Sequence, residues 1–304
     1  MPKFCICCGS EIYEYLDTSC AYRHPIDYVR CKDCGLIYMY GDDENLKKII
    51  EKYHQKYWQY GSKSKTNREI LVSKICRNIE YFLQNFGLGY IPQKIHWQFI
   101  TDYLKSNKIK NVLEVGGGEE SMLKFLEKKG YNVVGVESDT TICNKLKKSI
   151  KKGKCLNISV DKNIDANLKK FMKQKFDLII LSEVFYYFPR PDIVFKKLGN
   201  MLNKDGYIYL KMPNSNGLYW ENYNLKHGNA VFWFNKKNFT NMIEKLKFRI
   251  VIVKEIEYEI DMQSIFSRIA QFIKYDILNI RVPERENITP EKRGKLQCLI
   301  QGST

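Results

Sequence analysis

The stretch Asn111-Val-Leu-Glu-Val-Gly-Gly-Gly118 decides the fold of this chain. It is an apolar strand containing one acid, followed by three glycines that let the backbone turn sharply and approach a ligand closely. A helical pattern begins at Ser121, so the unpaired amides of a helix N-terminus face the same place. A strand, a glycine turn and a helix in this order predict a nucleotide-binding unit of an α/β sheet.

Strands and helices alternate after this loop, with short turns between them. Strands are expected at 112–115, 132–137, 154–160, 176–181, 207–212, 248–253 and 296–300, and helices at 121–129, 141–151, 193–202 and 235–246. Asn203-Lys-Asp-Gly206 is expected to be a turn into the fifth strand, and Asn235 to cap the last helix. This alternation predicts a parallel sheet covered on both faces by helices.

The chain divides into three predicted regions. Residues 1–45 are cysteine-rich and show little helical periodicity, whereas residues 46–105 have the apolar spacing of a helical linker or cap. Residues 106–304 form the main domain. Within it, an apolar stripe from Met262 to Ile277 marks a helical insertion around 262–294. Core packing is the preferred interpretation of this stripe, and a lid, a membrane-surface helix and a dimer contact are the alternatives.

Acidic side chains surround the glycine loop. Glu114 precedes it, and Glu119 and Glu120 follow it. Carboxylates at these positions would repel a pyrophosphate, but they suit a ligand that carries a sulfonium and an ammonium group. The next strand ends in Glu137, where an acid can accept hydrogen bonds from both hydroxyls of a ribose. The loop and its acids together favour S-adenosylmethionine as the ligand.

A second motif lies near the N-terminus, where Cys5-Ile-Cys-Cys8 and Cys31-Lys-Asp-Cys34 form a CxxC pair of pairs. Glycine follows each pair and allows the backbone to curl around the sulfur atoms. Four thiolates at this spacing predict a structural zinc site with Cys5, Cys8, Cys31 and Cys34 as ligands. Cys20 and His24, between the two pairs, are interpreted as bystanders. The thiols expected to be buried in apolar segments are Cys76, Cys143, Cys155 and Cys298.

These motifs resemble a known family. Val112-Leu-Glu-Val-Gly-Gly-Gly118, Val134-Gly-Val-Glu137, Phe176–Val184 and Leu202–Leu210 look like the successive motifs of class I S-adenosylmethionine-dependent methyltransferases. The resemblance covers about residues 93–255 and implies a Rossmann-like, seven-stranded, doubly wound sheet of order 3-2-1-4-5-7-6. The N-terminal part resembles the zinc ribbon fused to methyltransferases of bacterial sugar, capsule and related small-molecule pathways.

The resemblance also implies roles for individual residues. Glu114, Gly116 and Gly118 would line the methionine half of the cofactor, and Glu137 would bind its ribose. Asp161 would lie near the adenine. The pocket would be closed by Ser182, Glu183 and Val184. Two departures stand out: Glu120 occupies the position of the third loop glycine, and the aromatic stretch Phe185–Phe188 replaces a histidine that the family commonly has after the fourth strand.

The segment that follows the fifth strand is the candidate binding region for the methyl acceptor. This segment is expected to leave the carboxyl edge of the sheet, where doubly wound folds bind ligands. His227 is the candidate general base, with Glu221 or Tyr223 to orient it; a packing histidine is the alternative. Aromatic side chains in this segment suit a sugar ring. They are Tyr219, Trp220, Tyr223, Phe232, Trp233 and Phe234.

Composition bounds the remaining possibilities. The 304 residues are 44% hydrophobic and 28% charged, as in globular proteins, and the formal net charge is +16. Lysine is spread along the whole chain without a compact basic tract, so the excess is interpreted as compositional bias, although nucleic acid remains possible as a partner. No signal segment or transmembrane run is recognised, which favours the cytoplasm. The oligomeric state is left open.

Several functions compete. The leading one is O-methylation of a sugar or sugar nucleotide in polysaccharide biosynthesis, with a carbohydrate as the small-molecule partner. An RNA methyltransferase, for example one acting on ribosomal RNA, would also use the ribbon and the positive charge, but the chain has no Asn-Pro-Pro-Tyr type motif. Carbon methylation of a keto-sugar and a non-catalytic cofactor-binding scaffold are further alternatives. The acids at Glu114 and Glu137 count against the scaffold.

Overall fold

The computed structural model describes residues 4–21, 24–41, 100, 109–118, 121–160, 174–216, 230–258 and 293–302. The helices expected within 46–105 lie outside these residues, apart from Ile100, which is helical and buried. The insertion expected around 262–294 also lies outside them, apart from the residues that open the last strand at Arg293.

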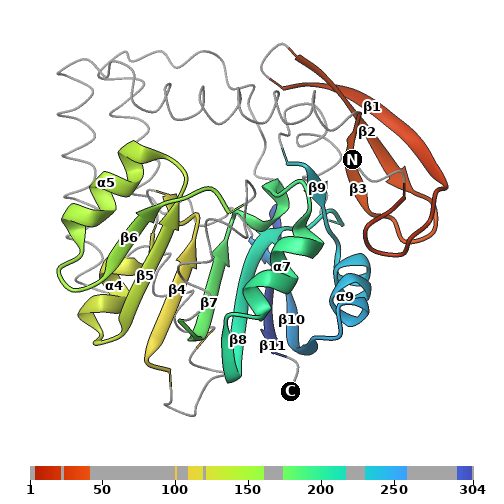
Figure 1. Ribbon diagram of the computed structural model, residues 1–304. Coiled ribbons are helices and arrows are strands. Elements are labelled where there is room, and N and C mark those ends of the chain that lie inside the picture. Colours follow the sequence, from red (N-terminus) through yellow and green to blue (C-terminus); the bar gives the residue numbers. More distant parts are fainter. Residues whose placement is uncertain are drawn as a thin grey trace.

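Seven strands form the main sheet (Figure 1). They are β4 (Asn111–Val115), β5 (Asn132–Glu137), β6 (Lys154–Asn157), β7 (Phe176–Ser182), β8 (Leu202–Pro213), β10 (Arg249–Tyr258) and β11 (Arg293–Gln301). Their order is β10-β11-β8-β7-β4-β5-β6, which is 3-2-1-4-5-7-6 when the strands are numbered along the chain from β4. The strands from β6 to β8 are parallel, and β11 runs antiparallel to both of its neighbours.

Helices cover both faces of this sheet. They are α4 (Leu123–Lys128), α5 (Thr140–Ser149), α7 (Pro191–Gly199) and α9 (Lys236–Lys245), together with the short 3-10 helix η2 (Phe185–Tyr187). In β7, Leu178 and Ile180 pack in the core that contains α4 and α5, whereas Ile179 and Leu181 pack with α7 and α9. All four side chains are fully buried, as expected for a central parallel strand.

The helix starts follow local sequence signals. Asn235 caps α9 as predicted: its side chain accepts a hydrogen bond from the Asn238 amide, and the Asn238 side chain accepts one from the Asn235 amide. Asp139 caps α5 by accepting from the Ile142 amide at 2.8 Å. Helix α7 begins at Pro191, two residues before the predicted start, because proline suits the first turn of a helix.

The prediction of a turn at residues 203–206 is wrong. Strand β8 begins at Leu202 and contains these residues as an irregularity in its pairing with β7: Phe176 pairs with Leu202, but Leu178 pairs with Tyr207. The side chain of Asp177, between the two pairs, accepts hydrogen bonds from the Asn203 amide group and from the main-chain amide of Asn111. The extra residues therefore form a bulge tied to the start of β4.

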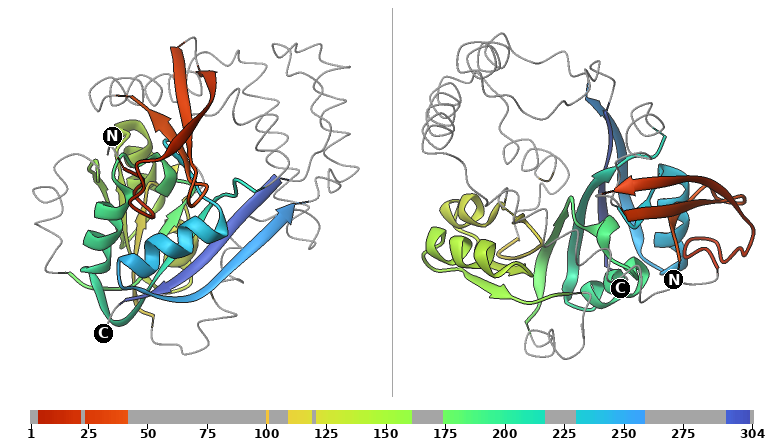
Figure 2. Two further views of the ribbon diagram at one scale, coloured as in Figure 1. Left: turned by 90° about the vertical axis from the view of Figure 1, so that its right-hand side faces the viewer. Right: turned by 90° about the horizontal axis from the view of Figure 1, so that it is seen from above.

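The N-terminal strands form a second, smaller sheet with a segment from the main domain. β1 (Tyr13–Ala21), β2 (His24–Cys31) and β3 (Ile37–Tyr40) pair in sequence order, and β3 also pairs with β9 (Phe232–Trp233). The Tyr28 hydroxyl donates to the Ala230 carbonyl at 2.8 Å, and the Met39 amide to the Val231 carbonyl at 2.9 Å. Figure 2 shows the small sheet lying beside α9. The N-terminal strands and residues 230–233 of the main domain thus share one sheet and one core.

The described helices include none that is both long enough and apolar enough to cross a membrane.

Candidate active site and cysteine cluster

Glu114 lies at the end of β4 and is buried. Its carboxylate accepts hydrogen bonds from the Met122 amide at 2.9 and 3.1 Å and from the Ser121 hydroxyl. Burial raises the pKa of Glu114, and the bonds from Met122 and Ser121 oppose that rise. The carboxylate is therefore fixed against the amides that open α4, directly beneath the glycine loop.

Glu137 ends the neighbouring strand β5 and is also buried. One carboxylate oxygen accepts a hydrogen bond from the Gly118 amide at 3.1 Å, and the other accepts one from the Asp139 amide at the same distance. Glu137 therefore joins the glycine loop after β4 to the turn after β5. The Ser138 hydroxyl also donates to the oxygen bound by Asp139, at 3.5 Å. The oxygen bound by Gly118 is therefore the better placed of the two to accept from a further donor, such as a ribose hydroxyl.

The glycine loop requires glycine at its first position. Gly116 has a φ of +65°, and its amide donates to the Val136 carbonyl at 2.8 Å. A Cβ atom there would lie 2.6 Å from Cγ2 of Val184, much closer than such atoms approach. Gly118 also has a positive φ, of 58°. The loop after β4 is thus in direct contact with the residues that follow β7.

The end of β7 carries a polar group within an apolar core. Ser182 is half-buried and pairs with Lys211 of β8. The next residue, Glu183, lies 3.7 Å from the Lys211 ammonium (Oε1 to Nζ), and it accepts a hydrogen bond from the Tyr186 hydroxyl at 3.2 Å. Lys211 and Tyr186 are both buried. Sequence reasoning placed Glu183 in the pocket but missed Lys211, although a lysine within the apolar strand Tyr207–Met212 signals a buried partner.

Four predicted site residues lie outside the described residues: Asp161, Glu221, Tyr223 and His227. Part of the aromatic segment around them is described, and there the expectation of a sugar-binding wall is wrong. Phe232, Trp233 and Phe234 are buried, Phe232 and Trp233 form strand β9, and Phe234 packs on Phe185 with ring centroids 5.7 Å apart. Their apolar rings fill the core beneath the small sheet.

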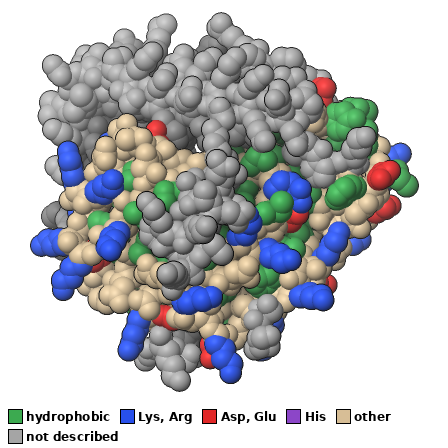
Figure 3. Space-filling model, viewed as in Figure 1, with side chains coloured by type: hydrophobic (Ala, Val, Ile, Leu, Met, Phe, Trp, Pro, Cys, Tyr) green, Lys and Arg blue, Asp and Glu red, His purple; other side chains and the backbone are tan. Residues whose placement is uncertain are grey.

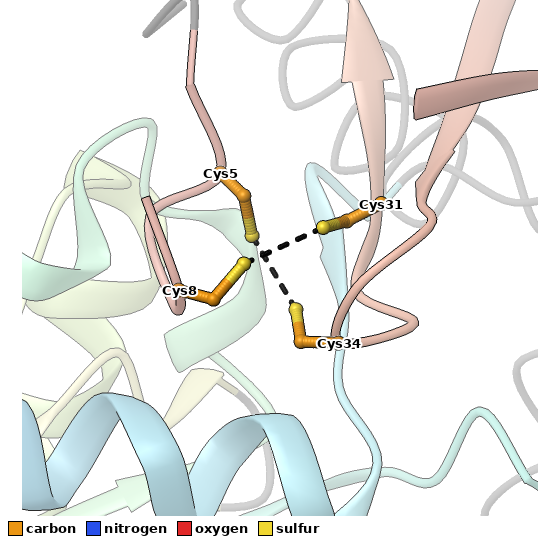
Figure 4. A group of neighbouring side chains, drawn as sticks. All are labelled: Cys5, Cys8, Cys31 and Cys34. Carbon is orange, nitrogen blue, oxygen red and sulfur yellow. Dashed lines mark hydrogen bonds between the residues drawn. The ribbon is translucent and has the colours of Figure 1, made fainter. Parts of the chain in front are cut away.

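The four predicted metal ligands come together (Figure 4). The sulfur atoms of Cys5 and Cys34 are 3.5 Å apart, as are those of Cys8 and Cys31, and all four lie within 4.8 Å of one another. Each pair closes a similar turn, in which the amide of Gly9 or Gly35 donates to the carbonyl of Cys5 or Cys31. A tetrahedral zinc ion with bonds of about 2.3 Å would hold its thiolates about 3.8 Å apart, so these residues fit such an ion.

Other described cysteines are buried, as predicted for Cys143, Cys155 and Cys298. The sulfur atoms of Cys143 and Cys155 are 3.3 Å apart. Cys7 is buried too, beside the four-cysteine cluster. Cys20 and His24 lie in the hairpin of β1 and β2, but their side chains are outside the described part of the molecule, as is Cys76.

The chain matches one family model and resembles several solved structures. A family model described as "Methyltransferase domain" matches residues 71–253, more than half of the chain. No curated protein sequence matches. A methyltransferase from Methanosarcina mazei shares 13% identity with a TM-score of 0.46, covering 71% of this chain and 99% of its own. A methyltransferase from Archaeoglobus fulgidus is 15% identical with a TM-score of 0.45, and the match covers 73% of this chain and 98% of that one. The plantazolicin methyltransferase BpumL is 15% identical with a TM-score of 0.48, and the match covers 86% of this chain and 100% of that one.

The family match spans the glycine loop, both buried acids and the polar group after β7. The chain therefore belongs to the methyltransferase-domain family, and it is an S-adenosylmethionine-dependent methyltransferase of class I.

Proposed function

We propose that this enzyme methylates a hydroxyl group of a small molecule, in particular a sugar or sugar nucleotide used in polysaccharide biosynthesis. The observation that carries the cofactor half of the proposal is the link between Glu137 and the glycine loop through the Gly118 amide. This link brings a carboxylate to the place where a nucleoside sugar lies in doubly wound folds.

The proposed cofactor site extends along the carboxyl ends of three strands. Glu114, Gly116 and Gly118 after β4 would hold the methionine half, and Glu137 after β5 the ribose. The cationic methionine end suits a loop that is backed by a carboxylate. Asp161 would lie near the adenine, and Ser182 and Glu183 would close the pocket after β7. The contact between Gly116 and Val184 supports this last assignment, because it joins the loop to the end of β7.

Methyl transfer to a hydroxyl is an in-line displacement at the methyl carbon, and the hydroxyl loses its proton. We assign the role of proton acceptor to His227, with Glu221 or Tyr223 to orient its ring. The assignment rests on the place of this segment in the sequence, after the carboxyl end of β8 and before β9.

A structural zinc ion bound by Cys5, Cys8, Cys31 and Cys34 completes the proposal. The cluster supplies four thiol ligands, the number that fills a tetrahedral zinc ion, which suits a closed structural site. The ion would fix the two turns that precede β1 and follow β2. Because β3 pairs with β9, a fixed ribbon would also support the segment next to the proposed methyl-acceptor site.

An RNA methyltransferase is the second candidate, favoured by the net charge of +16. Recognition of an RNA backbone requires a patch or stripe of basic side chains. On the face shown in Figure 3, the coloured Lys and Arg side chains are scattered over the surface and do not gather into a stripe. The distribution on this face therefore favours the small-molecule acceptor.

The test combines binding and transfer. The purified protein is titrated with S-adenosylmethionine and S-adenosylhomocysteine by calorimetry, and then incubated with methyl-labelled cofactor and either a panel of nucleotide sugars or total RNA. Label in a nucleotide sugar supports the proposal. Label in RNA alone supports the second candidate, and absence of cofactor binding rejects both.

A further inference from the structure

Glu183 has an unusual backbone for its residue type. Its φ is +57°, in the left-handed region that few residues other than glycine adopt. Its amide donates to the Lys211 carbonyl at 2.8 Å, which holds the peptide in this conformation. Strained backbone of this kind costs free energy and is concentrated at functional sites, where the strain places a side chain.

The side chain of Glu183 meets two buried polar groups. The ammonium of Lys211 lies 3.7 Å from one carboxylate oxygen, and the hydroxyl of Tyr186 donates to the other at 3.2 Å. The Lys211 side chain is only 8% exposed, whereas that of Glu183 is 28% exposed. A buried cation and a buried phenol therefore hold a carboxylate that solvent, or a ligand, still reaches.

The chemistry of Tyr186 fits the role of a permanent hydrogen-bond donor. Burial, together with the nearby Tyr187 and Glu183, raises the pKa of Tyr186 well above its ordinary value. The phenol thus stays protonated at physiological pH and keeps donating to Glu183. Its own peptide is held as well, because the Val231 amide donates to the Tyr186 carbonyl at 3.0 Å.

The position of this group links it to the cofactor loop. Glu183 directly follows β7, the neighbour of β4 in the sheet. The next residue, Val184, packs against Gly116, and the segment joined to Tyr186 leads from residue 230 into β9. Glu183 therefore belongs to a segment that contacts both the loop assigned to the methyl donor, through Val184, and the residues that lead into β9, through Tyr186.

From this geometry we propose that Glu183 binds a hydroxyl group of the methyl acceptor, and that Lys211 and Tyr186 are positioning residues that hold its carboxylate. The inference deepens the proposed function and rests on it. A carboxylate that is partly exposed accepts hydrogen bonds from neutral hydroxyl groups and repels phosphates and carboxylates. The part of the acceptor that faces Glu183 is then a polyol face, such as a sugar ring edge, and not its phosphate.

The test compares variants with the nucleotide sugar that the wild-type protein methylates, and with deoxy analogues that each lack one hydroxyl. E183Q is the first variant. The double variant E183Q/K211M guards against misfolding, because it removes the buried positive charge together with its partner. E127Q is the control: Glu127 is another hydrogen-bonded carboxylate, but its donors are the main-chain amides of the turn at residues 151–153, far along the sequence from the β7 end.

Both Glu183 variants are expected to raise KM for the nucleotide sugar about 10- to 100-fold, the effect of one hydrogen bond to a charged group. The rise in KM for the nucleotide sugar should be larger than any rise in the Kd for S-adenosylhomocysteine, because Glu183 is also assigned to the wall of the cofactor pocket. One deoxy analogue should show the same loss with the wild-type protein and no further loss with E183Q. Additive losses for every analogue, or an unchanged KM, would overturn the inference alone. If the wild-type protein methylates no nucleotide sugar, the proposed function fails and the inference falls with it.

Tyr186→Phe tests the positioning role separately. It removes one donor from the Glu183 carboxylate and leaves the ring in the core. We expect a smaller rise in KM than for E183Q, with the same deoxy analogue affected. An equal loss with all analogues would show that Tyr186 acts only on folding.

Discussion

The main-chain amide of Gly118 donates a hydrogen bond to a carboxylate oxygen of Glu137, 3.1 Å away. The two residues belong to the loops after neighbouring strands, β4 and β5. A single carboxylate thus sets the shape of the glycine loop and presents its remaining lone pairs to whatever the loop binds. Loss of the Glu137 carboxylate is therefore expected to disrupt the loop geometry and the ribose site together.

Replacement of Glu137 tests this coupling. We expect Glu137→Ala to weaken binding of S-adenosylmethionine about 100-fold, or about 2.7 kcal/mol, because it removes both the ribose contact and the anchor of Gly118. Titration calorimetry measures the change. Glu127→Ala is the matched control, since it also removes a carboxylate bound to main-chain amides, and it should bind the cofactor like the wild type.

Gly116→Ala separates backbone strain from steric conflict. The added Cβ would meet Val184 at 2.6 Å, on top of the positive φ. Gly130→Ala has a similar backbone constraint, with a φ of +92°, but its Cβ would meet nothing within 4 Å. Chemical denaturation should give a loss of about 1 kcal/mol for Gly130→Ala and about 2–4 kcal/mol for Gly116→Ala. Equal losses would show that the Val184 contact is unimportant.

The buried carboxyl group of Glu114 makes stability depend on pH. Burial raises its pKa in the folded state, so the folded protein binds a proton that the unfolded chain has released. The contribution of Glu114 to stability therefore falls as pH rises from the unfolded pKa of about 4.3 through the raised folded value.

Glu114→Gln should remove this dependence. Urea unfolding at about pH 5 and pH 7 is expected to show that the free energy of unfolding of the variant increases relative to that of the wild type as pH rises. The affinity of the variant for S-adenosylmethionine is expected to be lower than that of the wild type. A variant that loses stability relative to the wild type over this range would contradict the direction assigned to the pKa shift.

The cysteine cluster gives a prediction with adjacent residues as test and control. We expect about one zinc ion per chain by mass spectrometry, lost in Cys8→Ser and retained in Cys7→Ser, because the CxxC spacing and the mutual distances select Cys8. Removal of the ion with a chelator should lower the unfolding temperature of the wild type. Retention of zinc by Cys8→Ser would reject the proposed ligand set.

Sequence reasoning succeeded where the signal is local. The bounds of β5 were predicted without error, as were the cap at Asn235 and the convergence of the four cysteines, because strand pattern, capping residues and CxxC spacing are each read within a few residues. The glycine loop was recognised for the same reason.

It failed where contacts join distant parts of the chain. Strand β9 exists because Trp233 pairs with Ile37, nearly 200 residues earlier, and two residues are too short to show a strand pattern. The partnership of Lys211 with Glu183 depends on two strands being neighbours. Residues 203–206 likewise have the composition of a turn, and only the pairing of β8 with β7 shows that they belong to a strand.

We propose above all that the loop between β4 and α4 binds S-adenosylmethionine, with Glu137 as an essential partner. The most direct measurement is calorimetric titration of S-adenosylmethionine into the wild-type protein and into Glu137→Ala, with circular dichroism to establish that both are folded. We expect saturable binding of one molecule per chain by the wild type and a strongly weakened isotherm for the variant. Equal binding by both folded proteins, or no binding by the wild type, would contradict it.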